Sequence, residues 1–222
     1  KSSSVSDYYS NMDVDFLKIY NRVLTESEIG YLGASPIVYL APTGTYPSYT
    51  TTSSPTFNTS NVSFTGSTNV SGNFLNFGSL TFDMSKGFSI VSNVAFRSSG
   101  SYQRLIDFTP APGLFALEVS TGTNFRFEIG NAGAVDASSV LSFGTYAIFA
   151  CVYNPSSTVP RLYIYKNGTL VATATPTQVT DTRTVTQTWV GRSSSAADYY
   201  SNMDVNYLSI YNRVLTAAEI AN

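Results

Sequence analysis

The sequence predicts an all-β protein built as a two-sheet antiparallel sandwich, with one short helical turn at its C-terminus. β-branched and aromatic residues are abundant, with 16 Tyr and 14 Phe among 222 residues, and such residues favour strands over helices. Apolar and polar residues alternate with a period of two in many short segments. Turn-forming residues separate these segments at short intervals, which is typical of β-sandwiches.

The alternation is clearest in two segments, Gly87–Arg97 and Asn124–Ile129. Between Arg161 and Thr175, two strands flank Asn167-Gly168, which supplies the positive φ angles of a tight hairpin turn. Further strands are predicted at 37–41, 60–65, 73–82, 101–109, 113–119, 137–142, 145–153, 185–191 and 203–211. The C-terminal helical turn begins at the capping box Thr216-Ala217-Ala218-Glu219, in which each outer side chain satisfies a free backbone N–H.

The two ends of the chain repeat each other. Residues 1–31 and 192–222 align without a gap and are identical at 21 of 31 positions. A repeat of this length indicates whole tandem domains rather than a short-period solenoid. We therefore expect 1–32 to be the last strand and helical turn of a preceding copy, 33–36 to be a linker, and 37–222 to be one complete domain. The chain is then expected to be a piece of a longer protein, with neighbouring copies of the module as partners.

The charge content excludes several classes of partner. Charged residues make up 12% of the chain, the net charge is −2, and Lys and Arg form no run. Binding to nucleic acid or to an anionic membrane surface needs a basic patch, so neither is expected. No apolar stretch approaches the roughly 18–20 residues of a membrane span. The single cysteine, Cys151, lies in the apolar segment 146–153 and is expected to be a buried, unreactive side chain.

Several segments in a fixed order resemble one family. They lie at Phe64–Ser67, Gly87–Ile90, Ser101–Phe108, Arg161–Val171, Val190–Arg192 and Ile210–Thr216. Together they resemble the concanavalin A-like lectin/glucanase superfamily, specifically its laminin-G-like jelly-roll modules. The resemblance implies a jelly roll of two antiparallel sheets, often on secreted or surface proteins and often binding glycans. It implies little about chemistry, because function on this fold lies in the loops.

An enzymatic activity is not expected. The β-glucanases of this superfamily carry two or three carboxylates on one strand, which places these groups on a common face. Glu118, Glu128, Asp107 and Asp136 stand alone in different segments and match no such motif. The chain also has no histidine, the commonest general base.

The resemblance also implies Ca²⁺ at the rim of the sandwich, held by Asp, Asn and backbone oxygens. Asp198 and Asp204 flank the segment that leads into the last strand and are the candidate ligands. The alternative is that both are turn residues that bond their own backbone.

Sugar binding is the function that the sequence favours most. Exposed aromatic rings stack on sugar rings, while Arg, amide and hydroxyl groups bond the sugar hydroxyls. Tyr199 and Tyr200 lie in a polar loop, and Tyr102 and Arg104 begin a strand after a Ser/Gly-rich turn, so these four are the candidate carbohydrate-binding residues. The alternative for Tyr199 and Tyr200 is that they pack at the rim or make a contact between modules. Trp189 is a further aromatic residue that could stack on a sugar, with packing in the core or on the second sheet as its alternative.

Two functional hypotheses follow. The first is a non-catalytic carbohydrate-binding module of a larger extracellular, cell-surface or virion-surface protein, with a glycan or polysaccharide as its partner. The second is a structural spacer or fibre repeat on a cell or virion surface, without a small ligand. The tandem repeat fits both, because an array also raises the avidity of weak sugar binding.

Overall fold

The computed structural model describes Pro36 and residues 38–41, 53–66, 71–100, 102–109, 115–158, 161–195 and 197–221. It divides the chain into two units, Lys1–Gly33 and Ala34–Asn222, and every described residue belongs to the second. The expected tail of a preceding copy, 1–32, lies outside the described residues and stays a prediction.

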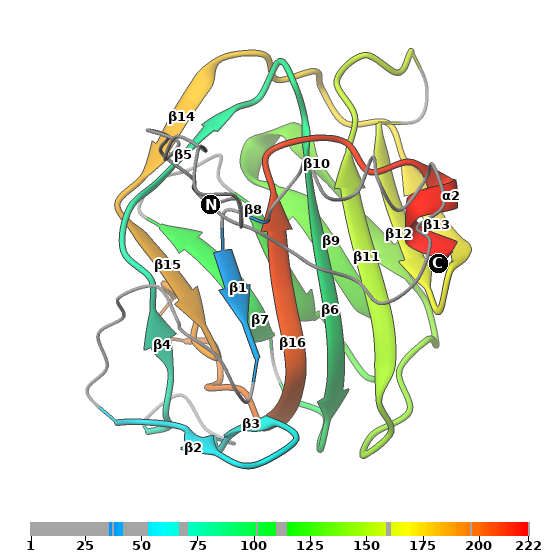
Figure 1. Cartoon of the computed structure of the whole chain (residues 1–222). Coiled ribbons are helices and arrows are strands. Elements are labelled where there is room, and N and C mark those ends of the chain that lie inside the picture. The colour runs from blue at the N-terminus through cyan, green and yellow to red at the C-terminus, as the bar shows by residue number, and fades with distance from the viewer. Residues whose placement is uncertain are drawn as a thin grey trace, which may run out of the picture. The chain divides into compact units, whose positions relative to one another are not determined.

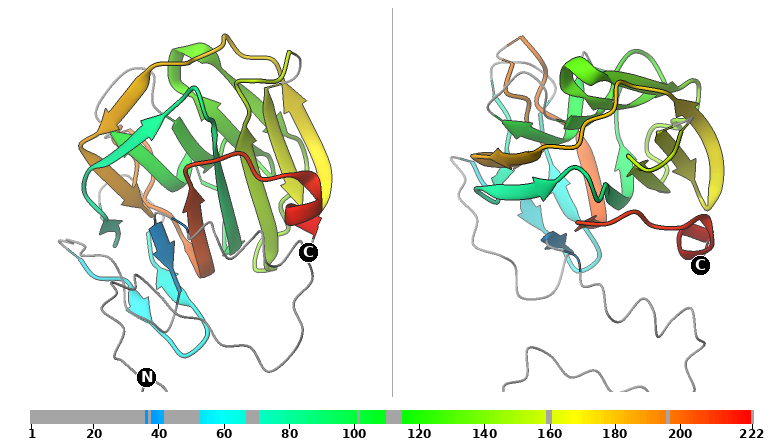
Figure 2. Two further views of the ribbon diagram at one scale, coloured as in Figure 1. Left: turned by 45° about the horizontal axis from the view of Figure 1, so that its top comes forward. Right: turned by 90° about the horizontal axis from the view of Figure 1, so that it is seen from above.

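The described residues form two large antiparallel sheets that pack face to face (Figures 1 and 2). The larger sheet runs in the order β13 (Thr169–Ala174), β12 (Leu162–Lys166), β11 (Ala147–Tyr153), β6 (Phe88–Phe96), β16 (Met203–Tyr211), β3 (Val62–Phe64) and β2 (Thr56–Phe57). A further strand, β1 (Val38–Leu40), pairs with the second half of β16. In this sheet β16, the last strand of the chain, lies between β6 and the early strands β1 and β3.

The second sheet has six strands among the described residues. Its order is β10 (Gly133–Ala137), β9 (Phe125–Ile129), β8 (Phe115–Val119), β7 (Gln103–Thr109), β15 (Gln187–Val190) and β4 (Leu75–Asn76). A separate ribbon pairs β14 (Thr182–Val185) with β5 (Leu80–Asp83). Beyond the sheets, the described residues form one 3₁₀ turn, η1 (Gly130–Ala132), and one short helix, α2 (Ala217–Ala221). The all-β sandwich with a C-terminal helical turn is therefore confirmed.

Aromatic side chains join the two sheets across the core. Phe125 of β9 stacks on Phe149 of β11 with ring centroids 4.3 Å apart. Phe127 of β9 meets Phe88 of β6 edge to face at 5.9 Å. Each such pair contributes about 0.5–1.5 kcal/mol beyond the area it buries. Cys151 is fully buried in the same core, and burial raises the pKa of its thiol well above the usual value, so the expectation of an unreactive cysteine is supported.

Two local predictions match the structure closely. Asn167 and Gly168 have φ angles of 48° and 78° in the turn between β12 and β13. At the start of α2, the Thr216 N–H donates to Glu219 Oε2 at 2.7 Å and the Glu219 N–H donates to Thr216 Oγ1 at 3.3 Å. The hairpin turn and the capping box are therefore confirmed.

Two strand predictions were wrong in their bounds. Residues 73–82 form no single strand, because Gly78 (φ 77°) turns the chain between β4 and β5, which belong to different pairings. Residues 137–142 contribute only Ala137 to a strand. The strand β10 begins four residues earlier, and Ser139, with φ 58°, ends its extended course in a turn.

Among the described residues, no helix has the length and apolar character that crossing a membrane requires.

Candidate functional site

The outer face of the six-stranded sheet, which points away from the core, is rich in charged residues. In β9, Phe125 and Phe127 are fully buried between the sheets, whereas Arg126 and Glu128, which alternate with them, lie on the outer face. Glu118 of β8 alternates with buried apolar residues in the same way. Alternate side chains of each strand thus lie in the core, and the side chains between them lie on the outer face.

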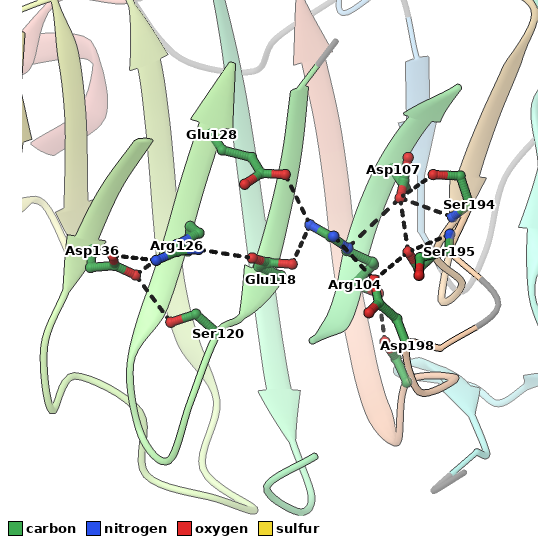
Figure 3. A network of polar contacts seen from close by, with 12 residues as sticks. Arg104, Asp107, Glu118, Ser120, Arg126, Glu128, Asp136, Ser194, Ser195 and Asp198 are labelled. Atoms are coloured by element: carbon green, nitrogen blue, oxygen red, sulfur yellow. Dashed lines mark hydrogen bonds and ion pairs between the residues drawn. The ribbon is translucent and has the colours of Figure 1, made fainter. Parts of the chain in front are cut away.

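The strand register places four of these residues in one row. Arg104 of β7 lies opposite Glu118 of β8, Glu118 lies opposite Arg126 of β9, and Arg126 lies opposite Asp136 of β10. We call this row the charge ladder; Figure 3 shows it from close by. Because the charges alternate in sign, each cross-strand pair is attractive.

A β-bulge adds Asp107 to the same face. Residues three apart in a regular strand point to opposite faces of the sheet. The register of β7 against β8 shifts between Arg104 and Ile106, so Leu105 and Ile106 are both fully buried. Arg104 and Asp107 consequently lie on the outer face together, with Nε and Oδ2 3.7 Å apart.

Arg104 is the centre of an ion-pair network. Its Nη1 contacts Glu118 and lies 3.3 Å from Glu128 Oε1, and its Nη2 lies 3.1 Å from Asp198 Oδ2. The Arg104 side chain is only 12% exposed and that of Glu118 only 1%. A guanidinium with five donors in a fixed plane is suited to several carboxylates at once. The network therefore stabilises the sheet from within rather than presenting Arg104 to solvent.

Burial shifts the acid–base behaviour of the network. It raises the pKa of Glu118 to about 8, although the positive charges of Arg104 and Arg126 act in the opposite direction. Burial also raises the pKa of Asp107, against the lowering effect of hydrogen bonds from Ser194. At the exposed end of the ladder, the hydrogen bonds from Arg126 lower the pKa of Asp136. Glu118 thus binds a proton more readily than an ordinary glutamate does, whereas Asp136 stays charged at neutral pH.

A loop of residues 191–202, which we call the rim loop, connects β15 to β16 beside this network. Its ends are fixed by backbone hydrogen bonds, from Ser201 N to Gly191 O at 3.0 Å and from Arg97 N to Asn202 O at 2.8 Å. The loop also binds the start of β7, with the Ser201 side chain Oγ donating to Arg104 O at 2.5 Å and the Asn202 backbone N–H donating to Gln103 Oε1 at 2.8 Å. Both ends of the loop are therefore anchored to neighbouring strands.

Three serines attach the rim loop to the ion-pair network. Ser193 Oγ donates to Asp198 Oδ2 at 2.7 Å, and the Ser194 N–H donates to Asp107 Oδ2 at 3.0 Å. The Ser195 N–H in turn donates to Ser193 Oγ at 3.0 Å. The buried Ser193 side chain thus points toward the sheet, whereas Ser194 and Ser195 are exposed.

Next to the network lies a group that we call the arginine–aromatic cluster, made of Arg192, Trp189, Phe74 and Tyr200. The guanidinium carbon of Arg192 lies 4.5 Å from the ring centroid of Trp189, 4.9 Å from that of Phe74 and 5.5 Å from that of Tyr200. Trp189 is on the outer face, opposite Asp107 in the register. These distances are within the range of cation–π attraction.

The structure brings three of the four candidate sugar-binding residues to one rim. Tyr199 and Tyr200 are half-buried in the rim loop, and Tyr102, 37% exposed, precedes the residue to which the loop is bonded. Tyr102 has a positive φ of 52°, which is uncommon for a bulky side chain and costs energy. Arg104 lies beneath the loop with its guanidinium taken by carboxylates, so the structure does not favour its predicted role as a sugar contact.

The two candidate calcium ligands lie apart in the hydrogen-bond network. Asp198 pairs with Arg104 and accepts from Ser193, whereas Asp204 lies 3.2 Å from Arg97 Nη2 and accepts from Ser63 at 2.5 Å. Each carboxylate is thus neutralised by a different arginine. Within the described part of the chain, no group of three or more Asp, Glu or Cys side chains is arranged to hold a metal ion. This arrangement does not fit a shared Ca²⁺ site.

Glu118, Glu128, Asp107 and Asp136 lie on four different strands and form no one-strand motif, but the fold brings all four to the outer face. Sequence separation concealed this, because the strands that carry them become neighbours only in the folded sheet. Arg192, Trp189 and Phe74 were also missed as a group. The alternation of Trp189 with the buried Thr188 and Val190 is a sequence signal that Trp189 lies outside the core.

Comparisons with solved structures give the same fold at low sequence identity. A Trypanosoma rangeli sialidase in complex with sialic acid matches with a TM-score of 0.61 and 16% identity, over 82% of this chain and 31% of that one. A botulinum neurotoxin type C, whose cell entry depends on interaction with two ganglioside molecules, matches with a TM-score of 0.63 and 12% identity, over 87% of this chain and 51% of that one. The binding domain of botulinum neurotoxin DC in complex with rat synaptotagmin II matches with a TM-score of 0.60 and 14% identity, over 84% of this chain and 50% of that one.

The present chain thus spans between 31% and 51% of the length of these structures. No curated protein sequence matches it. A family model described as the concanavalin A-like lectin/glucanases superfamily matches residues 67–221, which include the outer face, the rim loop and most of both sheets. By this match and by its two-sheet fold, the chain belongs to the concanavalin A-like lectin/glucanases superfamily.

Proposed function

We propose that this protein is a non-catalytic carbohydrate-binding module of a larger, repeat-containing protein at a cell or virion surface. The observation that supports the proposal is the rim loop, which carries Tyr199 and Tyr200, is fixed at both ends and is bonded to Gln103, the neighbour of Tyr102. Aromatic rings on a fixed support stack on a sugar with little loss of conformational entropy. Similar structures that bind sialic acid or gangliosides support the same class of ligand.

The state of the carboxyl groups supports a non-catalytic role. A glycosidase needs two carboxyl groups that reach the substrate, one as acid and one as nucleophile or base. On the outer face, each described carboxylate is paired with Arg104 or Arg126, and Glu118 is almost fully buried. The two arginines thus hold these carboxylates in ion pairs, which supports a non-catalytic role.

Alanine at Tyr102 or Tyr199 is expected to weaken glycan binding by roughly 5- to 30-fold, because one stacking ring contributes on the order of 1–2 kcal/mol. A glycan array identifies the ligand, and titration calorimetry of the full chain measures its affinity. The melting temperature should stay within a few degrees. Binding should survive EDTA, and the protein should release no reducing ends from the bound polysaccharide.

Tyr163→Ala is the matched control, because Tyr163 is half-buried like Tyr199 but lies on β12 level with Ser89, at the end of β6 opposite the rim loop. This variant should bind as the wild type does. Wild-type affinity in a Tyr102→Ala/Tyr199→Ala double variant would place the glycan elsewhere. Sugar release that depends on a single carboxylate would contradict the non-catalytic role.

The alternative of a structural repeat is favoured by one observation. In β16, the buried residues Met203, Val205, Leu208 and Ile210 have identical counterparts at Met12, Val14, Leu17 and Ile19. The segment 1–31 therefore carries the side chains that fill the β16 position, yet one domain has room for one such strand. A segment of this kind is suited to pairing with a neighbouring copy.

If the repeat mediates contacts between copies, the full chain should form dimers or larger assemblies in solution, whereas residues 36–222 alone should be monomeric. Size-exclusion chromatography with light scattering measures both masses, and thermal melting compares their stability. If both proteins are monomeric and have equal melting temperatures, the structural-repeat function is contradicted. Carbohydrate binding would be unaffected by this result.

A further inference from the structure

Arg192 differs from the other described arginines in its partners. Arg97, Arg104, Arg126, Arg183 and Arg213 each pair with a carboxylate, and Arg161 donates to a backbone carbonyl. Arg192 makes no hydrogen bond or ion pair with any described residue and contacts only aromatic rings. Ring faces attract the charge of a guanidinium but leave its in-plane N–H groups free for an acceptor. Since Arg192 is only partly buried, a ligand can supply that acceptor.

The rings around Arg192 are held rigidly. Phe74 is nearly buried, and its ring lies 6.1 Å from that of Trp189 and 6.3 Å from that of Tyr200. Tyr200 packs on a bridge between Gly66 and Gly72, where an added Cβ would lie 2.4 Å and 2.3 Å from the Tyr200 Cβ. Only glycine at these two positions leaves room for the Tyr200 ring. The arginine–aromatic cluster is therefore preorganised, as a binding site requires.

The repeat contains the same two kinds of residue. In the alignment of 1–9 with 192–200, Lys1 aligns with Arg192 and Tyr9 aligns with Tyr200. Between these two positions, only Val5 and Ser6 differ from their counterparts. A positive charge and an aromatic ring thus occur at corresponding positions in both copies. In a tandem array, a weak site in each copy would add up to high avidity.

We propose that Arg192 binds the carboxylate of an acidic sugar, of the sialic or uronic acid class, whose ring packs against the adjacent aromatic side chains. This proposal rests on the carbohydrate-binding function and names its ligand class. A planar carboxylate accepts two parallel hydrogen bonds from one guanidinium. A single unpaired cation balances one negative charge, whereas a phosphate carries nearly two. The aromatic rings favour a sugar over a free small anion.

The test compares acidic glycans with neutral counterparts on the full chain. The probes are sialyllactose against lactose and oligogalacturonate against its methyl ester, with a sulfated oligosaccharide as a third arm. Titration calorimetry should give at least about tenfold tighter binding of one carboxylated probe than of its neutral counterpart. Because the protein has a net charge of −2, general attraction of acids does not account for such a preference.

Two variants and a control assign the preference to Arg192. Arg192→Met should abolish it, and Arg192→Lys, which keeps the charge but loses the fork, should retain only part of it. Arg183→Met, which removes a guanidinium paired with the exposed Asp181, should leave it unchanged. Melting temperatures verify that each variant is folded, and Arg192→Lys keeps the test valid if Arg192→Met does not fold.

Three results would overturn the proposal. Equal affinity for acidic and neutral probes, or an acid preference that persists in Arg192→Met, would refute the role of Arg192 while leaving carbohydrate binding intact. Tighter binding of the sulfated than of the carboxylated probe would refute the ligand class. Absence of binding to every glycan, in this panel and on an array, would refute the proposed function itself.

Discussion

Arg104→Ala is expected to lower the free energy of unfolding by about 3–5 kcal/mol, which is typical of removing one partner of a buried ion pair. The substitution leaves Asp107 and Asp198, and above about pH 8 also Glu118, under the rim loop without their common cation. It also removes side-chain packing beneath the loop, which is bonded to the Arg104 carbonyl. The main effect should therefore be on stability and not on glycan affinity at the rim.

Urea unfolding monitored by the fluorescence of Trp189, the single tryptophan, measures this loss. Arg126→Met is the matched control. Arg126 is 29% exposed and its main partner, Asp136, is 36% exposed, so its loss should be nearer to 1 kcal/mol. Arg104→Met/Glu118→Leu should recover part of the stability, because it removes a buried charge together with its partner. A stability loss below 1 kcal/mol combined with lost glycan binding would instead restore Arg104 as a sugar contact.

The sequence predicted those parts of the fold that depend on local pattern. The strand predicted at 203–211 matches β16, and the Asn167-Gly168 turn and the Thr216–Glu219 capping box depend on residues a few positions apart. The two misplaced strands failed at Gly78 and Ser139, where a single positive φ angle ends the extended chain. Such an angle is strongly suggested by glycine but not by serine.

The candidate site was predicted less well, because it depends on register between distant strands. Arg104 meets Glu118 only because β7 pairs with β8, and it meets Asp107 only because of the bulge at Leu105. Neither the pairing of these strands nor the bulge can be predicted from composition or from the alternation of apolar and polar residues. The position of Tyr199 and Tyr200 in a polar loop could be predicted from the local sequence. The surroundings of Arg192 could not, because they include Phe74, which is far away in the sequence.

The stability of the protein should fall as the pH rises from about 5.5 to 8.5. Burial raises the pKa of Glu118 from its usual 4.5 to about 8, so the folded state binds a proton that the unfolded state has already released. The stabilisation is complete below pH 4.5 and is lost as the pH rises toward the folded-state pKa. One such group changes the free energy of unfolding by at most about 1.4 kcal/mol per pH unit, so the total should be on the order of 2–4 kcal/mol.

Urea unfolding at a series of pH values measures this slope, and two features of the chain make it interpretable. The sequence contains no histidine, whose titration would otherwise fall in this window. The pKa values of Asp136 and Glu219 are lowered by arginine hydrogen bonds, so the stability they provide is lost only in more acidic solution. Glu118→Gln keeps the shape of the side chain but cannot ionise, and it should flatten the profile. A wild-type stability that is constant or rises between pH 5.5 and 8.5 would mean that Arg104 and Arg126 outweigh the burial of Glu118 and hold it in the charged form.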